Sequence, residues 1–91
     1  MTTSSSIVSI GSANQAAVTP REIFQRAILS GATAITISHN HPSGDTTPSE
    51  ADVAVTKRLK ECGLILGITV LDHVIVTDTS HYSLRETTDH W

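Results

Sequence analysis

Residues 32–52 read ATAITISHNHPSGDTTPSEAD, and this stretch organises the rest of the chain. Residues 32–38 include the β-branched run Ile35-Thr36-Ile37, which is typical of a buried strand. The polar residues 39–47 contain proline, glycine and aspartate and predict a loop. Thr47-Pro48-Ser49-Glu50 then has the spacing of a capping box, so we expect a helix that begins at Pro48.

An earlier helix is predicted just before this strand. Thr19 offers an N-cap hydroxyl, Pro20 suits the first helical position and Glu22 completes a capping box. Gly31 should end this helix near Ser30. The expected apolar face consists of Ile23, Phe24, Ala27 and Ile28. For the second helix the expected apolar stripe consists of Ala51, Val55, Leu59 and Cys62, with an end at Gly63 or Gly67.

Short runs rich in β-branched residues predict further strands at residues 7–10, 68–71 and 74–77, and a last short strand is expected around 82–84, after a turn at 78–80. Strands that alternate with helices in this order indicate an α/β fold, with a mixed sheet and flanking helices. A chain of 91 residues fits one domain, which we place at residues 7–91. The Ser/Thr run before it, residues 1–6, has no apolar partner and is expected to be a disordered or artificial tail.

The charge balance argues against a protein whose task is to hold phosphate backbones. The formal net charge is −3 and the sequence pI is about 5.9, whereas nucleic-acid binding requires clustered Lys and Arg. Neither a secretion signal nor an apolar run long enough to cross a bilayer is present, so no membrane association is expected. The lone Cys62 cannot form an internal disulfide, which fits a reducing, cytoplasmic location.

Two histidines and one aspartate suggest a metal site. His39 and His41 stand two residues apart at the end of a predicted strand, so their side chains leave the same face. Asp52 lies early in the next helix, and two imidazoles plus one carboxylate are a ligand set of catalytic zinc. Ser49 is placed to assist a developing oxyanion. The alternatives are structural histidines, a Ser49 that only begins a helix, and an Asp52 that only favours the helix dipole.

The motif resembles a known enzyme family. The spacing of His39, His41-Pro42, Ser49 and Asp52 matches the H-x-H-P-x6-S-x-x-D signature of JAMM (MPN+) metalloenzymes. Further similarity to the C-terminal domain of RadC-like proteins lies in HNHPSGD at 39–45, PREIF at 20–24, GITVLDH at 67–73 and YSL at 82–84. The resemblance implies a cytidine-deaminase-like (JAB/MPN) fold, zinc on both histidines and Asp52, and hydrolysis of peptide or isopeptide bonds in a protein substrate, with Ser49 as an assisting residue.

The sequence also departs from the family pattern. The family's general-base glutamate falls at Ser6, so the chain is expected to hydrolyse little even when it binds zinc. The domain is expected to be N-terminally truncated and to pair with another copy through an open strand edge. His73 is expected to be structural or to lie just outside the metal ligands. The competing hypothesis is a non-catalytic interaction module of a DNA-repair-associated protein.

Overall fold

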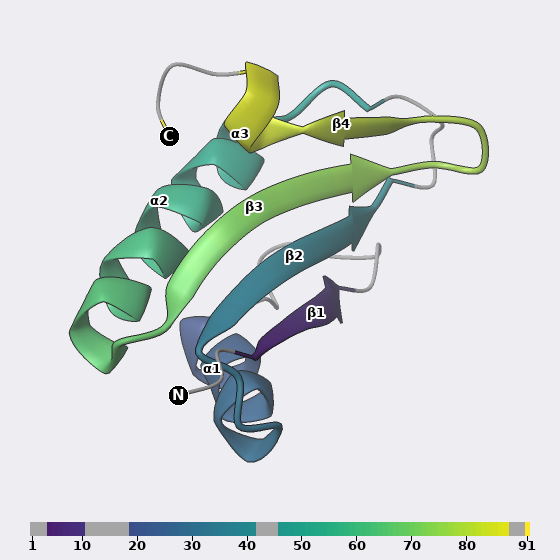
Figure 1. Ribbon diagram of the computed structural model, residues 1–91. Helices are drawn as coiled ribbons and strands as arrows, with labels where there is room; N and C mark the ends of the chain where they lie inside the picture. Colours follow the sequence, from purple (N-terminus) through teal and green to yellow (C-terminus); the bar gives the residue numbers. More distant parts are fainter. Residues whose placement is uncertain (1–3, 11–18, 42–45, 88–90) are drawn as a thin grey trace.

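The computed structural model of the protein describes residues 4–10, 19–41, 46–87 and 91. The elements are β1 (Ser5–Ile10), α1 (Pro20–Leu29), β2 (Ala34–Asn40), α2 (Glu50–Leu66), β3 (Thr69–Val76), β4 (His81–Ser83) and α3 (Leu84–Thr87). They form a four-stranded sheet of order β1-β2-β3-β4, in which the first three strands are parallel and β4 is antiparallel to β3. The predicted α/β fold with a mixed sheet is confirmed (Figure 1).

The strand order explains why the main helices share one face of the sheet. The chain forms two successive βαβ units, β1-α1-β2 and β2-α2-β3, and both step across the sheet in the same direction. Crossovers between parallel strands are almost always right-handed, so two steps in one direction bring their helices to the same side. The result is a two-layer structure with α1 and α2 over one face (Figure 1).

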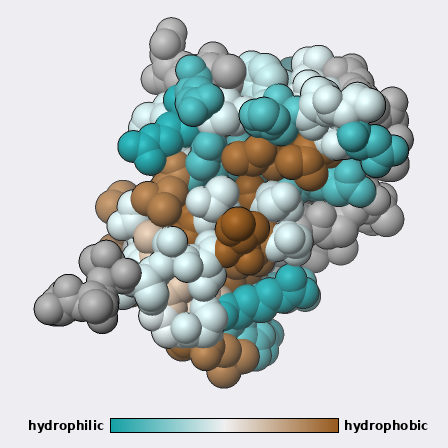
Figure 2. Space-filling model, turned by 45° about the vertical axis from the view of Figure 1, so that its right-hand side comes forward, coloured by the Kyte–Doolittle hydropathy of each residue, from teal (hydrophilic) through white to brown (hydrophobic). Residues whose placement is uncertain are grey.

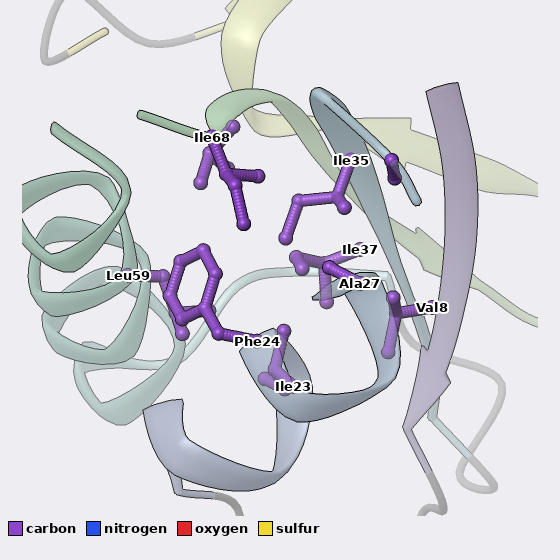
Figure 3. Packing of buried hydrophobic residues seen from close by; sticks show 10 residues of the cluster. Val8, Ile23, Phe24, Ala27, Ile35, Ile37, Leu59 and Ile68 are labelled. Atoms are coloured by element: carbon purple, nitrogen blue, oxygen red, sulfur yellow. The ribbon is translucent and has the colours of Figure 1, made fainter. Parts of the chain in front are cut away.

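The core lies between these helices and the sheet. Phe24 of α1 and Leu59 of α2 meet Ile35 and Ile37 of β2, and all four are buried (Figure 3). Fully burying a side chain of this kind contributes roughly 1.5–3 kcal/mol relative to leaving it exposed. The predicted apolar face of α1 is correct at Ile23, Phe24 and Ala27, but Ile28 lies on the surface.

Apolar side chains also reach the surface. Figure 2 shows apolar patches on one face of the molecule, separated by polar residues. The exposed large hydrophobic residues within the described parts are Ile7, Ile28, Leu29, Leu64, Ile65 and Leu66. In those parts no helix combines the length and the apolar character that a bilayer crossing requires.

The first strand begins earlier than predicted. Ser5 and Ser6 belong to β1 and pair with Ala34 and Ile35 of β2. The expected tail at residues 1–6 is therefore wrong for these two serines, while residues 1–3 lie outside the described parts. The reason is that ladder hydrogen bonds use the backbone, so polar side chains do not prevent pairing with a neighbouring strand.

The second helix begins at Glu50 with Ser49 as its N-cap, two residues later than predicted. The backbone N–H of Ser49 donates to Asp52 Oδ2 at 2.7 Å, and the backbone N–H of Asp52 donates to Ser49 Oγ at 3.1 Å. This reciprocal pair is itself a capping box, so it competes successfully with the one proposed at Thr47. Asp52 thus occupies the third helical position and faces the sheet.

The buried stripe of α2 differs from the predicted one. The buried residues are Asp52, Thr56, Leu59 and Gly63. Ala51 is exposed, and Val55 and Cys62 are only half-buried against the core. Two polar residues occupy the sheet-facing side, which a search for apolar periodicity cannot detect.

The helix continues through Gly63 and ends at Leu66. Gly67 caps it in the left-handed conformation, with φ of 74°. Gly63 is required for a different reason: a Cβ there would lie 2.3 Å from the backbone oxygen of Ile68. A glycine inside the helix therefore lets the chain turn back closely into β3.

Residues 68–71 and 74–77 were predicted to be separate strands, but residues 69–76 form one strand, β3. A register shift next to Leu71 keeps the ladder with β2 intact, since Ile35 pairs with Val70 and Thr36 with Asp72. The Asp72 carboxylate accepts hydrogen bonds from the Ser83 hydroxyl and the Arg85 backbone N–H. An aspartate inside a strand is tolerated here because neighbouring donors satisfy it.

Candidate metal centre

The end of β2 positions the first two candidate ligands. His39 continues the alternation of Ile35 and Ile37 and therefore points to the helix-covered face, where only 2% of it is exposed. His41 follows the strand directly, and its backbone N–H donates to Val76 O at 3.0 Å. The two imidazole rings meet edge to face with centroids 4.7 Å apart. Both side chains consequently converge at the carboxyl end of the parallel strands.

The N-terminus of α2 brings Asp52 to the same place. Nδ1 of His39 lies 3.2 Å from Asp52 Oδ1, and Nε2 of His41 lies 3.3 Å from Asp52 Oδ2. The capping box fixes the rotamer of this carboxylate, and the positive end of the helix dipole favours its negative charge. Asp52 is 1% exposed, so its charge is stabilised by these groups rather than by bulk water.

A third histidine and a threonine complete the buried cluster. His73 of β3 is 1% exposed, and its ring centroid lies 5.7 Å from that of His39. Thr56, one turn after Asp52, has its hydroxyl 2.7 Å from His73 Nδ1 and donates to the Asp52 backbone oxygen at 2.8 Å. Nε2 of His73 has no hydrogen-bond partner among the described residues.

Burial keeps the inner histidines neutral. It lowers the pKa of His73 to about 4, and the neighbouring His39 lowers it further while Asp52 and Asp72 act in the opposite sense. Burial also lowers the pKa of His39, against the opposing influence of the Asp52 carboxylate. Neutral imidazole is the form that binds a metal ion. At neutral pH both rings are therefore in the binding form.

The donor atoms fit a divalent metal ion. Donors that each lie about 2.0–2.1 Å from a tetrahedral zinc ion are roughly 3.3–3.4 Å apart. The contact between His39 Nδ1 and Asp52 Oδ1, 3.2 Å, and the contact between His41 Nε2 and Asp52 Oδ2, 3.3 Å, are each close to this edge length but involve different carboxylate oxygens. His39, Asp52 and His73 can also each offer one ligand atom, all within 4.8 Å of one another. Imidazole nitrogens and carboxylate oxygens are ligands of zinc, and imidazole also suits copper, iron and nickel.

The remaining residues named from the sequence lie at two different distances from this cluster. Ser49 adjoins it as the N-cap, where its hydroxyl accepts the Asp52 N–H. Ser6 lies elsewhere: it pairs with Ile35, four positions along β1 from the residue that pairs with His39, and its hydroxyl contacts that of Ser30 at 3.1 Å. Four strand residues span roughly 13 Å. A glutamate at position 6 would therefore not reach the cluster.

Sequence patterns gave little indication of the roles of Thr56 and His73. Thr56 lies four residues after Asp52, and this helical spacing is the signal that points to a shared buried face. His73 was expected to be structural or to lie outside the ligands, and the structure places it directly beside His39. Its neighbour is 34 residues away in sequence, so only strand pairing brings the rings together.

Comparison with known proteins places the chain in a family. Residues 2–89 match the family model described as RadC-like JAB domain. A UPF0758 protein of Clostridium novyi (strain NT) is 57% identical over 79 residues, which cover 87% of this chain and 35% of that protein. A UPF0758 protein of Caldanaerobacter subterraneus subsp. tengcongensis is 60% identical over 79 residues, which cover 87% of this chain and 34% of that protein.

A third similar protein matches a comparable part of the chain. The UPF0758 protein of Methanococcoides burtonii is 51% identical over 80 residues, which cover 88% of this chain and 35% of that protein. The chain thus spans about a third of the length of the curated relatives it matches. The match over residues 2–89 includes both histidines at the end of β2, Asp52 and His73. The chain belongs to the RadC-like JAB domain family.

Proposed function

We propose that this domain is a zinc-dependent hydrolase that acts on peptide or isopeptide bonds. The observation that carries the proposal is the position of two imidazole nitrogens 3.2 and 3.3 Å from one buried carboxylate. The membership of the JAB family and the resemblance of the H-x-H-P-x6-S-x-x-D spacing to JAMM metalloenzymes support the same chemistry. His39, His41 and Asp52 are the residues that would hold the ion.

The chain's own groups prepare the site in distinct ways. When bound, a zinc ion supplies Lewis acidity and lowers the pKa of a coordinated water to about 7. Asp52 is held in place by its hydrogen bond from the Ser49 N–H, while His39 is fixed by burial in the core. His41 is on the more accessible side, with 16% of its side chain exposed. A substrate would therefore approach past His41.

Ser49 is the candidate that would contact the substrate. Its residue is exposed, at the beginning of α2, and its hydroxyl oxygen accepts the Asp52 N–H. Because a hydroxyl can accept one hydrogen bond and donate another, the proton of Ser49 can be directed to an oxyanion. Ser49 thus combines a capping role with the proposed catalytic one.

The first experiment measures the metal and the activity separately. Zinc content and zinc affinity of the purified chain are determined for the native protein and for His39→Ala. His81→Ala, which changes an exposed histidine of β4, is the matched control. Cleavage is then followed on quenched fluorescent peptides and on a peptide that carries an isopeptide-linked lysine. We expect one zinc per chain, lost in His39→Ala only. We expect weak cleavage, because serine stands where the family pattern has its general-base glutamate, and this cleavage should stop when a chelator removes the metal.

The outcomes separate the hypotheses. Stoichiometric zinc without cleavage of any probe would limit the domain to metal binding. Absence of zinc from the native chain, even with zinc in excess, would overturn the proposal and favour the non-catalytic interaction module. A mobility shift on DNA that weakens with salt would point to that module's partner, against the expectation from the net charge of −3.

We also propose that the domain assembles with a second copy through the edge of its sheet. Within the described residues β1 is one edge of the sheet, and its Ile7 is 74% exposed. An edge strand with an exposed apolar residue offers unpaired backbone groups to a second copy. Sedimentation at micromolar concentration should show a dimer, and Ile7→Lys should shift it to monomer; a native chain that sediments as a monomer would refute the pairing.

A further inference from the structure

Thr56 and His73 share a hydrogen bond whose direction is set by the surrounding atoms. The Thr56 hydroxyl carries a single proton and lies 2.8 Å from the Asp52 backbone oxygen, which can only accept. That proton is therefore donated to Asp52. His73 Nδ1, which lies 2.7 Å from the same hydroxyl, must then be the donor of the second bond. Two consecutive hydrogen bonds thus connect β3, through Thr56, to the backbone of Asp52.

These bonds join the first turns of α2 to the sheet. Thr56 lies one helical turn after Asp52 and faces the sheet with it. On the sheet side, the ring of His73 lies beside that of His39, with centroids 5.7 Å apart. Leu59, the next residue of the buried stripe, offers only apolar contact, which has no preferred direction. A hydrogen bond is directional, so the bond from His73 fixes where this part of the helix lies on the sheet.

The stability of the core does not explain the pair. Both residues are buried, with 5% of Thr56 and 1% of His73 exposed. Nε2 of His73 has no hydrogen-bond partner among the described residues, so the ring leaves a buried polar atom unsatisfied. Apolar residues of similar shape would avoid this cost, because replacing both partners of a buried hydrogen bond can be nearly neutral for stability. The unsatisfied atom therefore points to a role in the site.

The candidate metal centre requires a constraint of this kind. Asp52 Oδ1 lies 3.2 Å from His39 Nδ1, and Asp52 Oδ2 lies 3.3 Å from His41 Nε2. Functional side chains have to be held within about 0.5 Å of their working geometry by the groups around them. The capping box at the start of α2 fixes the carboxylate within the helix but not the helix against the sheet. The bond between Thr56 and His73 supplies this second constraint.

We propose that Thr56 and His73 are positioning residues of the metal site, whose hydrogen bond holds Asp52 against the two histidine ligands. This inference rests on the proposed function and deepens it. Neither residue is a ligand, so the ion keeps the vacant position that the proposed chemistry needs. Ligand atoms of His39, Asp52 and His73 are separated by up to 4.8 Å, which is wider than a tetrahedral edge and agrees with a place for His73 outside the ligands.

The test compares zinc affinity with stability. Thr56→Val keeps the shape of the side chain and removes the hydroxyl, and Thr69→Val, which changes an exposed threonine of β3, is the matched control. We expect zinc affinity to fall by about 10–100-fold in Thr56→Val, as for loss of an outer partner, and to stay unchanged in the control. Thr56→Ser, which keeps the hydroxyl, should retain the native affinity. Competition with a chromophoric chelator measures all four chains.

A double variant separates positioning from a purely structural role. Thr56→Val with His73→Phe replaces both partners by apolar groups of similar shape. Urea denaturation of the metal-free chain should show stability close to native, while zinc affinity stays low. The absorption spectrum of the cobalt-loaded chain should differ from the native spectrum, because the ligand geometry changes. A double variant with native zinc affinity and a native cobalt spectrum would overturn the inference.

Native zinc affinity in a folded Thr56→Val variant would also overturn it. If that variant does not fold, His73→Asn and His73→Gln decide. The amide N–H of asparagine lies near the place of Nδ1 and that of glutamine near the place of Nε2, so we expect tighter zinc binding in His73→Asn. Equal affinities would reject the inference. A native chain that binds no zinc would instead reject the proposed function itself, so the two failures are distinguishable.

Discussion

The two halves of α2 use the same buried stripe for opposite purposes. In the first half Asp52 and Thr56 face the sheet and meet His39 and His73. In the second half Leu59 packs in the apolar core, and Gly63 lets the chain approach closely. Asp52 is as buried as Leu59, with exposed fractions of 1% and 0%. The comparison teaches that burial on this helix marks the site as well as the core, and that residue chemistry tells them apart.

The largest expected effect is on metal binding by the first half. Asp52→Asn keeps the volume of the side chain and an oxygen for the cap but removes the charge that would bind a cation. We expect zinc affinity to fall by more than about 100-fold, beyond the effect of losing an outer partner. Competition with a chromophoric chelator measures it, and Glu61→Gln on the exposed face serves as control. Equal zinc affinity of the native and Asp52→Asn chains would show that the first half of α2 does not contribute to a metal site.

The second half should respond in stability alone. Leu59→Ala leaves a cavity at a position with no exposure and should lower the free energy of unfolding by about 2–5 kcal/mol. Leu64→Ala, at a position 85% exposed on the same helix, should change it by less than about 0.5 kcal/mol. Urea denaturation measures both. Folded Leu59→Ala should still bind one zinc; a lost site would show that the two halves are coupled.

Acid should weaken the metal-free protein through its buried histidines. The pKa of His73 falls from 6.5 to about 4 on folding, so the unfolded chain binds more protons between these values. Stability is therefore fully present above pH 6.5 and is lost as the pH falls toward 4, by about 3 kcal/mol in total. His39, whose pKa burial also lowers, acts with the same sign. Denaturation of the native chain and of His73→Gln from pH 7.5 to 4 checks this, with a shallower dependence in the variant; parallel curves would contradict it.

The smallest expected effect concerns the N-cap. Ser49→Ala removes the oxygen that accepts the Asp52 N–H and should cost about 1 kcal/mol of stability, whereas Ser49→Gly should cost only a few tenths. Thermal unfolding of the metal-free variants gives the comparison. If the two variants are equally destabilised, the hydroxyl contributes nothing as a cap, and its role is confined to the proposed chemistry.

The sequence predicted those features of the fold that depend on residues close together in the chain. The helix α1 and its Thr19 N-cap were correctly predicted because capping and helical spacing act over a few residues. The start of α2 was misplaced because two overlapping capping boxes, at Thr47 and Ser49, compete in one stretch. The sequence predicted two strands in place of β3 because a charged aspartate, Asp72, lies between the two apolar runs. The structure shows that its carboxylate accepts hydrogen bonds from Ser83 and Arg85.

The candidate site shows the same division. His39, His41, Ser49 and Asp52 were identified together because their spacing forms a motif within fourteen residues of sequence. The structure then brings the two histidines and the aspartate within contact distance. Thr56 and His73 belong to no such motif. The hydrogen bond that joins them crosses from α2 to β3, and pattern analysis of either segment alone does not contain it.

The sequence by itself determined the alternation of strands and helices, the caps of α1, the acidic charge balance and the three candidate ligands, because each depends on composition or on neighbours along the chain. Only the tertiary structure decided which face of α2 is buried and that His73 lies beside His39. Strand pairing and helix packing set these contacts between segments far apart in sequence. Their free energy comes from burial shared by several elements, so no single segment encodes them.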